Sequence, residues 1–199
     1  MKYKLDDLTE TAKRLAKLGP GTQRNLLLVA GLPGVGKTTL ARELAGRTRA
    51  VHFDIDSVKK MVVPQDKVSE EIDPPEYRHK YYLETIHRLP DLFAQDHNQT
   101  VVIDETFHLQ CFRDMWTEVA KSLNIKLFWV EVVCPEQVVK ERLRLGRGRE
   151  NHILGDKAYP MYLLFKDMFE PMSGPREIVD NSRDLAPQLQ KIVKKLGNP

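Results

Sequence analysis

The stretch Gly31-Leu32-Pro33-Gly34-Val35-Gly36-Lys37-Thr38 fits the pattern G-x-x-x-x-G-K-[ST] at every position. An apolar run at 26–30 precedes it, and a helix-like stretch at 39–46 follows it. A phosphate-binding loop requires this context, because a strand delivers the loop and the N-terminus of a helix receives the anion. The eight residues therefore predict a site for the phosphates of a nucleotide.

The residue types in this loop indicate how a nucleotide is held. Glycines let the backbone curl so that successive N–H groups point at a phosphate. Lys37 can reach the β- and γ-phosphate oxygens, and the Thr38 hydroxyl can coordinate Mg²⁺. We expect ATP to contact the loop and the start of the helix, at Gly31, Pro33, Gly34, Val35, Gly36, Lys37, Thr38 and Thr39.

Bulk properties restrict the class of protein. A length of 199 residues suits one α/β domain, and a net charge of +3 is too small to argue for a nucleic-acid or membrane partner. Cys111 and Cys134 lack C-x-x-C spacing, which favours reduced thiols over a disulfide or a zinc site. The first twenty residues lack the apolar core of a secretory signal, and no apolar run is long enough to span a bilayer. We therefore expect a cytoplasmic protein, and its oligomeric state stays open.

Strand-like and helix-like segments alternate along the chain. Short apolar runs rich in β-branched residues predict five strands, at 25–30, 50–53, 100–103, 125–133 and 177–179. Helical patterns lie at 38–46, 57–63, 76–96, 109–123, 135–147, 156–168 and 184–196. This alternation predicts an α/β fold in which helices on both sides sandwich a five-stranded parallel sheet. We expect a single domain over 1–199, with an amphipathic helix within 1–22 that packs against it.

Acidic residues follow two of the predicted strands. Asp54 and Asp56 come after 50–53, where a carboxylate could take a proton from a hydroxyl substrate or help hold Mg²⁺, or where Asp56 could only cap a helix. Asp104 ends the run at 100–103, and in phosphate-loop proteins an Asp at this point binds Mg²⁺ opposite the loop hydroxyl. We therefore predict a metal site formed by Thr38 and Asp104. The adjacent Glu105 either orients water for ATP hydrolysis or is a solvated loop acid.

Arginines gather after the fourth predicted strand. They are Arg142, Arg144, Arg147 and Arg149, with Gly146 and Gly148 between them. The glycines indicate that the chain leaves its helix near Gly146, and we predict a lid over 142–158. A lid that closes over ATP could neutralise charge on the transferring phosphoryl group and exclude water. Arg144 and Arg149 fit a solvated charged face equally well.

The segment 74–98 has the aromatic and polar composition expected of a helical wall beside an acceptor pocket. Tyr77, Arg78 and Tyr81 are its candidate substrate contacts, whereas Tyr82, Ile86 and Leu89 recur at helical spacing and fit the core. This segment has three cationic and four acidic residues, and the resulting net negative charge disfavours binding to the phosphate backbone of a nucleic acid. The composition thus favours a small-molecule acceptor.

With these motifs in place, the chain resembles the small P-loop kinases grouped around polynucleotide 5′-kinase, gluconate-kinase-like enzymes, chloramphenicol phosphotransferase and zeta toxins. The match is nearest to the kinase family named AAA_33 and covers roughly 25–182. Its pieces, in order, are GLPGVGKTTLAREL at 31–44, DSVK at 56–59, VVIDET at 101–106, VEVVCPEQVVKERLRLGR at 130–147, FEP at 169–171 and IVDNS at 178–182.

The resemblance implies roles for particular residues. In that family the Asp of a D-x-x-R motif accepts the proton of the acceptor hydroxyl, which places this role on Asp56. The partner arginine falls on Lys59, and lysine cannot reproduce the bidentate contact of an arginine. The lid arginines fall on Arg142 and Arg147, and the loop at 180–182 borders the adenine. The resemblance also implies a sheet in which the strand before the phosphate loop is central.

Together these observations predict an ATP- and Mg²⁺-dependent phosphotransferase that moves the γ-phosphate to a hydroxyl group. A small-molecule acceptor is favoured over the 5′-hydroxyl of a polynucleotide. The predicted catalytic residues are Lys37, Asp56, Arg142 and Arg147, and the predicted substrate contacts are Asp54, Lys59, Tyr77, Arg78 and Tyr81.

Two alternatives from other classes stay open. One is an NTP-hydrolysing switch, in which Glu105 positions water and the N-terminal helix engages a protein partner. The other is a regulatory domain that binds a nucleotide without chemistry, although the presence of Lys37, Asp56 and Asp104 argues against it.

Overall fold

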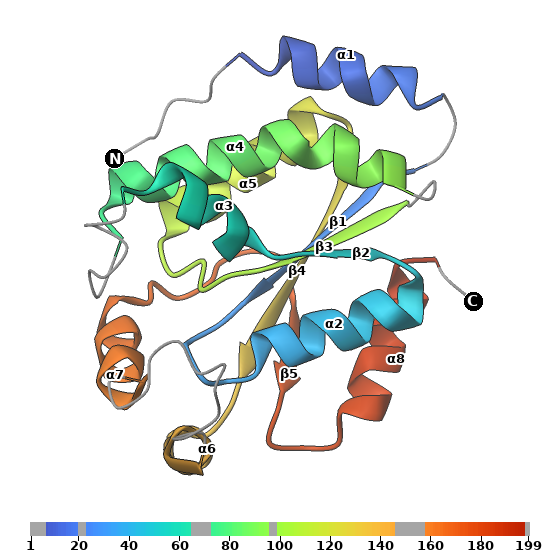
Figure 1. Ribbon diagram of the computed structural model, residues 1–199. Helices are drawn as coiled ribbons and strands as arrows, with labels where there is room; N and C mark the ends of the chain where they lie inside the picture. Colours follow the sequence, from blue (N-terminus) through green and yellow to red (C-terminus); the bar gives the residue numbers. More distant parts are fainter. Residues whose placement is uncertain (1–6, 20–22, 65–72, 96–98, 146–157, 198–199) are drawn as a thin grey trace.

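The computed structural model describes residues 7–19, 23–64, 73–95, 99–145 and 158–197. A parallel sheet in the order β2-β3-β1-β4-β5 forms the middle layer (Figure 1). Its strands are β1 (Asn25–Ala30), β2 (Val51–Phe53), β3 (Thr100–Asp104), β4 (Lys126–Val133) and β5 (Glu177–Asp180). The predicted strands agree to within one residue at each end. The central place of β1, which delivers the phosphate loop, confirms the expected sheet order.

Helices cover both faces of the sheet. One face carries α3 (Ile55–Val62), α4 (Pro75–Ala94) and α5 (Gln110–Ser122), and the opposite face carries α2 (Lys37–Thr48) and α8 (Leu185–Lys195) (Figure 1). Two further helices, α6 (Glu136–Leu145) and α7 (Ala158–Met168), lie toward the carboxyl ends of the strands. The predicted sandwich of helices around a five-stranded parallel sheet is thereby confirmed.

The sequence of β1 explains why both faces are covered. Side chains alternate between the two faces of a strand, and all six residues of β1 are buried. Leu26 and Leu28 belong to the apolar cluster formed with α4 and α5, whereas Leu27 and Val29 belong to the cluster formed with α2 and α8. A continuous apolar run is the pattern expected of a strand covered on both sides.

The helix α1 (Thr9–Lys17) packs on the outer side of α4 rather than on the sheet (Figure 1). Leu15 is buried there, and Thr11 Oγ1 lies 3.0 Å from His87 Nδ1 of α4. Arg14 also forms an ion pair with Asp91. The apolar face of this helix therefore contacts its own domain, as expected from the sequence.

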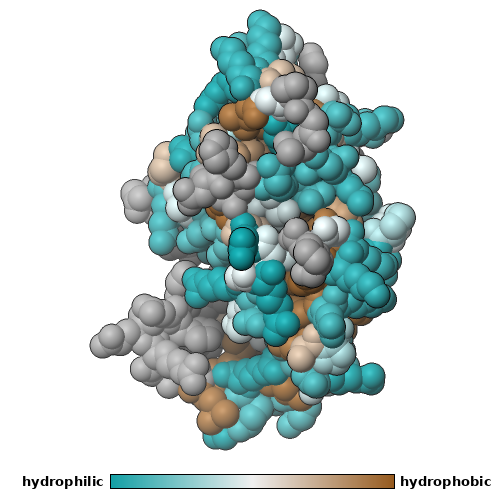
Figure 2. Space-filling view, turned by 90° about the vertical axis from the view of Figure 1, so that its right-hand side faces the viewer, coloured by the Kyte–Doolittle hydropathy of each residue, from teal (hydrophilic) through white to brown (hydrophobic). Residues whose placement is uncertain are grey.

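The surface shown in Figure 2 is largely hydrophilic, with small hydrophobic patches separated by polar side chains. Within the described ranges, no helix combines the length and the apolar character needed to cross a membrane.

Candidate nucleotide and acceptor site

The candidate site lies along the edge of the sheet where the parallel strands end. The phosphate loop 31–38 follows β1, Asp54 and Asp56 follow β2, and Glu105 follows Asp104, the last residue of β3. Asn181 follows β5 at the same edge. Because all five strands run in the same direction, residues from four separate parts of the chain are brought together here.

Close backbone packing explains the glycines of the phosphate loop. Gly34 and Gly36 have φ angles of 78° and 94°, in the left-handed region that favours glycine. A Cβ atom at Gly36 would overlap the side-chain amide of Asn181, and one at Gly31 would lie 2.6 Å from the carbonyl oxygen of Val132. The loop conformation therefore depends on these positions lacking side chains.

The loop is held from the opposite side by Asn181. Its Nδ2 donates a hydrogen bond to the carbonyl oxygen of Val35 at 2.6 Å. The backbone carbonyl oxygen of Asn181 accepts a hydrogen bond from Arg142 Nη2 at 2.7 Å. Arg142, which lies on α6, is thus linked to the phosphate loop through Asn181.

Of the other arginines of the predicted lid, only Arg144 lies within the described residues. Arg144 forms an ion pair with Glu141 at 2.8 Å on an exposed helix face, which is the solvated arrangement that the sequence allowed. Arg147 and Arg149 lie outside the described residues, as does the remainder of the expected lid from 146 to 157. The lid therefore stays a prediction.

Thr38 and Asp104, the residues of the predicted metal site, lie within hydrogen-bond distance of each other. Thr38 Oγ1 donates a hydrogen bond to Asp104 Oδ2 at 2.7 Å, and His52 Nε2 of β2 lies 2.6 Å from Asp104 Oδ1. A hydroxyl and a carboxylate are hard oxygen donors of the kind that Mg²⁺ prefers, so these side chains fit the expected metal. The sequence reasoning missed His52, whose only signal was a polar residue in an otherwise apolar strand.

Lys37 is surrounded by acidic residues. Its Nζ donates a hydrogen bond to the carbonyl oxygen of Leu32 at 3.0 Å, which curls the side chain back over the loop. Burial lowers the pKa of Lys37, and the negative charges of Glu105, Asp104 and Asp56 oppose this shift. The ammonium group of Lys37 therefore lies between the phosphate loop and the acidic residues that follow β2 and end β3.

Asp54 and Asp56 have separate roles in the local structure. Asp54 Oδ1 accepts a hydrogen bond from the backbone N–H of Asp56 at 3.0 Å, so Asp54 is the N-cap of α3. The helix accordingly begins at Ile55, two residues earlier than predicted. In the described part of the chain no group hydrogen-bonds to the side chain of Asp56. Desolvation raises the pKa of Asp56, and the charges of Glu105 and Asp54 raise it further.

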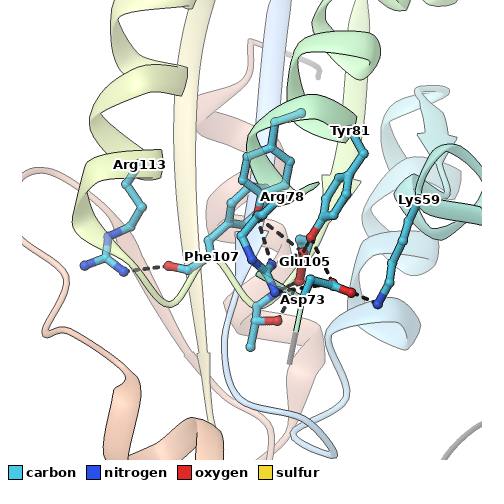
Figure 3. Close-up of polar contacts among 9 residues, drawn as sticks. Lys59, Asp73, Arg78, Tyr81, Glu105, Phe107 and Arg113 are labelled. Atoms are coloured by element: carbon cyan, nitrogen blue, oxygen red, sulfur yellow. Dashed lines mark hydrogen bonds and ion pairs between the residues drawn. The ribbon is translucent and has the colours of Figure 1, made fainter. Parts of the chain in front are cut away.

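Glu105 is the centre of a buried polar network (Figure 3). Its Oε2 lies 2.6 Å from Arg78 Nη1 and accepts hydrogen bonds from the hydroxyls of Tyr81 and Tyr82 at 3.2 and 3.3 Å. Its Oε1 accepts hydrogen bonds from the backbone and hydroxyl of Thr106 at 2.5 and 2.6 Å.

The electrostatics of this network keep Glu105 ionised. Burial opposes its charge, but the Arg78 guanidinium and the hydrogen bonds from Thr106 prevail and lower the pKa of Glu105 to about 2. Glu105 is thus neither a solvated loop acid nor a carboxylate with a free oxygen for orienting water.

The predicted acceptor contacts lie at different depths. Arg78 and Tyr81 are only 2% and 1% exposed, with their polar atoms directed at Glu105 and Asp73. Tyr77 is partly buried, with Lys80 Nζ 5.5 Å from its ring centroid. Lys59 Nζ lies 2.8 Å from Asp73 Oδ2. Asp73 was not predicted, because nothing in its sequence spacing distinguishes it from a solvated acid before a helix.

Arg113 is a third residue that the sequence reasoning missed, after His52 and Asp73. Its Nη1 donates to the carbonyl oxygen of Phe107 at 2.6 Å, and its Nη2 donates to that of Glu170 at 2.8 Å. Phe107 has a φ angle of 47°, which is strained for a non-glycine residue. The buried guanidinium therefore fixes the turn after β3 and ties it to the segment 169–171.

A five-stranded parallel sheet with a phosphate loop after its central strand defines the P-loop fold. The AAA_33 family, described as an AAA domain, matches residues 26–156, which is more than half of the chain. The chain therefore belongs to the AAA_33 family, which confirms the resemblance noted in the sequence. A search of curated proteins finds no match.

Solved structures of small kinases share the fold. A gluconokinase from Sinorhizobium meliloti 1021 is 20% identical, with a TM-score of 0.64, and the match covers 89% of this chain and 98% of that one. A sugar kinase from Janibacter sp. HTCC2649 is 17% identical, with a TM-score of 0.63 and coverage of 87% and 95%. The APS kinase of Mycobacterium tuberculosis, in complex with AMPPNP and APS, is 16% identical, with a TM-score of 0.61 and coverage of 89% and 100%.

Proposed function

We propose that this protein is an ATP- and Mg²⁺-dependent phosphotransferase that moves the γ-phosphoryl group to a hydroxyl of a small molecule. The observation that carries the proposal is the position of Asp56. Its carboxylate has no hydrogen-bond partner in the described part of the chain, and its negative charge is one of those that oppose the lowering of the pKa of Lys37 in the phosphate loop. A base of this kind, beside a donor loop, is what phosphoryl transfer to a hydroxyl requires.

The donor half of the proposed site is the loop together with Asp104. Backbone N–H groups of the loop and the ammonium group of Lys37 bind the phosphates of ATP. Thr38 and Asp104 would hold Mg²⁺, which when bound neutralises charge on the phosphate oxygens. Arg142 and Arg147 are proposed to neutralise charge on the transferring group. Arg142 is already near the loop, since it donates a hydrogen bond to Asn181.

The acceptor half is assigned to Asp56. In the proposed step the acceptor oxygen forms a bond to the γ-phosphorus, its proton passes to Asp56, and the bond to ADP breaks. The raised pKa of Asp56 makes its carboxylate a stronger base than an ordinary aspartate, which favours this proton transfer. Because Asp56 is in the first turn of a helix capped by Asp54, its backbone is fixed at the end of β2.

The nucleotide-hydrolysing switch has less support. That alternative needs Glu105 to orient a water molecule, but both of its carboxylate oxygens already accept hydrogen bonds from protein groups. The solved structures with this fold point in the same direction, because the three described above carry kinase names.

The proposal is tested by measuring ADP release from ATP and Mg²⁺ over a panel of sugars, nucleosides, antibiotics and 5′-hydroxyl oligonucleotides. We expect at least one small hydroxyl compound to stimulate ADP release and to be recovered with one added phosphate. Rapid ADP release without any acceptor, unchanged over the whole panel, would instead support the hydrolytic switch. Transfer only to oligonucleotides would support a polynucleotide kinase.

A further inference from the structure

Lys59, which stands where the resemblance implies a substrate-binding arginine, already has a protein partner. It lies one turn after Asp56 on α3, so the two side chains share a face of that helix. Its Nζ is 2.8 Å from Asp73 Oδ2, at the start of the segment that leads into α4 (Figure 3). A substrate anion would have to compete with this carboxylate for the lysine.

Asp73 is poorly placed to release its partner. The residue is 5% exposed, and its other oxygen, Oδ1, is buried with no hydrogen-bond partner among the described residues. Arg78 Nη2 is 3.6 Å from Oδ2, a longer contact than that of Lys59. Because a buried carboxylate is costly unless it is paired, removal of Lys59 toward a ligand is unfavourable.

Arg78, the second cation of this region, is also paired with a protein carboxylate. Arg78 is 2% exposed, and its Nη1 is 2.6 Å from Glu105 Oε2. Asp54 and Asp56, by contrast, are exposed at the end of β2. Among the described residues of this region, four carboxylates (Asp54, Asp56, Asp73 and Glu105) therefore face two cations outside the phosphate loop (Lys59 and Arg78). The third cation that interacts with these acids, Lys37, belongs to the loop and is assigned to the phosphates of ATP.

From this charge arrangement we infer that the acceptor is a hydroxyl compound without negative charge, either neutral or cationic. A carboxylate or phosphate on the acceptor would meet Asp54 and Asp56 while both nearby cations stay bound to protein acids. Like-charge contacts of this kind act as a barrier to the wrong ligand. The inference rests on the proposed phosphotransferase activity and narrows its substrate class.

The first test compares acceptors that differ in charge but little in shape. Initial rates are measured with saturating ATP and Mg²⁺ for the pairs glucose and glucuronate, and glycerol and glycerate. We expect the neutral member of any active pair to have a kcat/KM at least about 10-fold higher, which corresponds to a like-charge cost of about 1.4 kcal/mol. A higher kcat/KM for the anionic member would overturn the inference but leave the phosphotransferase proposal intact.

Failure of the underlying proposal has a different signature. If the protein binds ATP but neither these pairs nor the wider acceptor panel stimulates ADP release, the phosphotransferase proposal fails, and the inference fails with it.

A second test changes the charge of the network itself. Asp73→Asn leaves Lys59 without its carboxylate, so the ratio of kcat/KM for neutral over anionic acceptors should fall by about 10-fold. The double variant Lys59→Met/Asp73→Asn removes both partners together and should keep the wild-type ratio within about threefold. Glu43→Gln, which removes an exposed partner of Arg47 on α2, controls for the change in net charge.

The double variant separates the two possible roles of Lys59. If the lysine grips an anionic acceptor, Lys59→Met/Asp73→Asn loses activity on that acceptor and the inference is wrong. The comparison remains usable if Asp73→Asn alone fails to fold, because the double variant does not leave a partly buried lysine without its partner.

Discussion

Arg78 and Glu105 form an ion pair of 2.6 Å that joins α4 to the residue following β3. The Arg78 side chain is 3% exposed and that of Glu105 13%, so the pair lies largely out of water. Two tyrosine hydroxyls and Thr106 complete the hydrogen bonding of the carboxylate. This pair therefore holds the end of β3, which carries Asp104, against α4.

Glu105→Gln should therefore lower the free energy of unfolding, whatever its effect on phosphoryl transfer. Loss of one partner leaves the Arg78 charge buried without its counterion, and the expected decrease in the free energy of unfolding is about 3 kcal/mol. Urea denaturation measures this change. The control is Glu84→Gln, which breaks the more exposed pair with Arg88 and should cost less than about 1 kcal/mol. Equal stability losses in the two variants would contradict this account of the network.

Stability should fall in two stages as the pH is lowered. His108 is 1% exposed, and burial together with Arg78 lowers its pKa from 6.5 to about 4. Between these values the unfolded chain binds a proton at His108 that the folded chain does not. Acidification from pH 6.5 to 4 thus favours unfolding, by up to about 3 kcal/mol. In His108→Gln the slope of unfolding free energy against pH over this window should be smaller, and an unchanged slope would rule out His108 as its source.

The second stage belongs to Glu105. Its pKa is lowered from 4.5 to about 2, so the stability it contributes is fully present above pH 4.5 and is lost as the pH falls through 2. Urea titrations of the wild type and Glu105→Gln between pH 5 and 2 measure this contribution. The two unfolding free energies should converge toward the acidic end, and a constant difference over the window would contradict the assignment.

The strands could be predicted from sequence because their runs are short and rich in apolar, β-branched residues. The phosphate loop was equally readable, and the Thr38–Asp104 contact follows from placing two strand ends at one edge of a parallel sheet. The burial of Arg78, a candidate substrate contact, was not predicted, although its spacing offered a signal. It lies four residues before Tyr82, on the same helical stripe as the buried Ile86.

Other parts of the site had no comparable signal. The pairing of Lys59 with Asp73 joins the last turn of α3 to a residue just before α4, and it depends on how those helices pack rather than on spacing. His52 reaches Asp104 only because β2 pairs with β3, and strand order cannot be read from a three-residue strand. Tertiary neighbours, rather than local pattern, therefore determine these contacts.

Two glycines of the same region provide a matched test of the phosphate loop. Gly36→Ala places a methyl group against Asn181 at a left-handed backbone position, so the loop must shift and ATP affinity should fall by at least about 10-fold. Gly46→Ala, in the interior of α2 with no neighbouring atom within 4 Å, should raise stability by about 0.5–1 kcal/mol and leave ATP affinity unchanged. Calorimetric titration with ATP and thermal unfolding measure the two effects. Wild-type ATP affinity in Gly36→Ala would show that the loop is less constrained than its contacts indicate.

The central claim is that Asp56 takes the proton of the acceptor hydroxyl, while the phosphate loop binds ATP. The most direct measurement follows γ-phosphoryl transfer and ATP affinity together in Asp56→Asn, with the exposed Asp114→Asn on α5 as the control for the same chemical change. We predict that transfer in Asp56→Asn falls by about 10²- to 10⁴-fold while the Kd for ATP stays within about threefold of wild type. Transfer at the wild-type rate in Asp56→Asn would contradict the account.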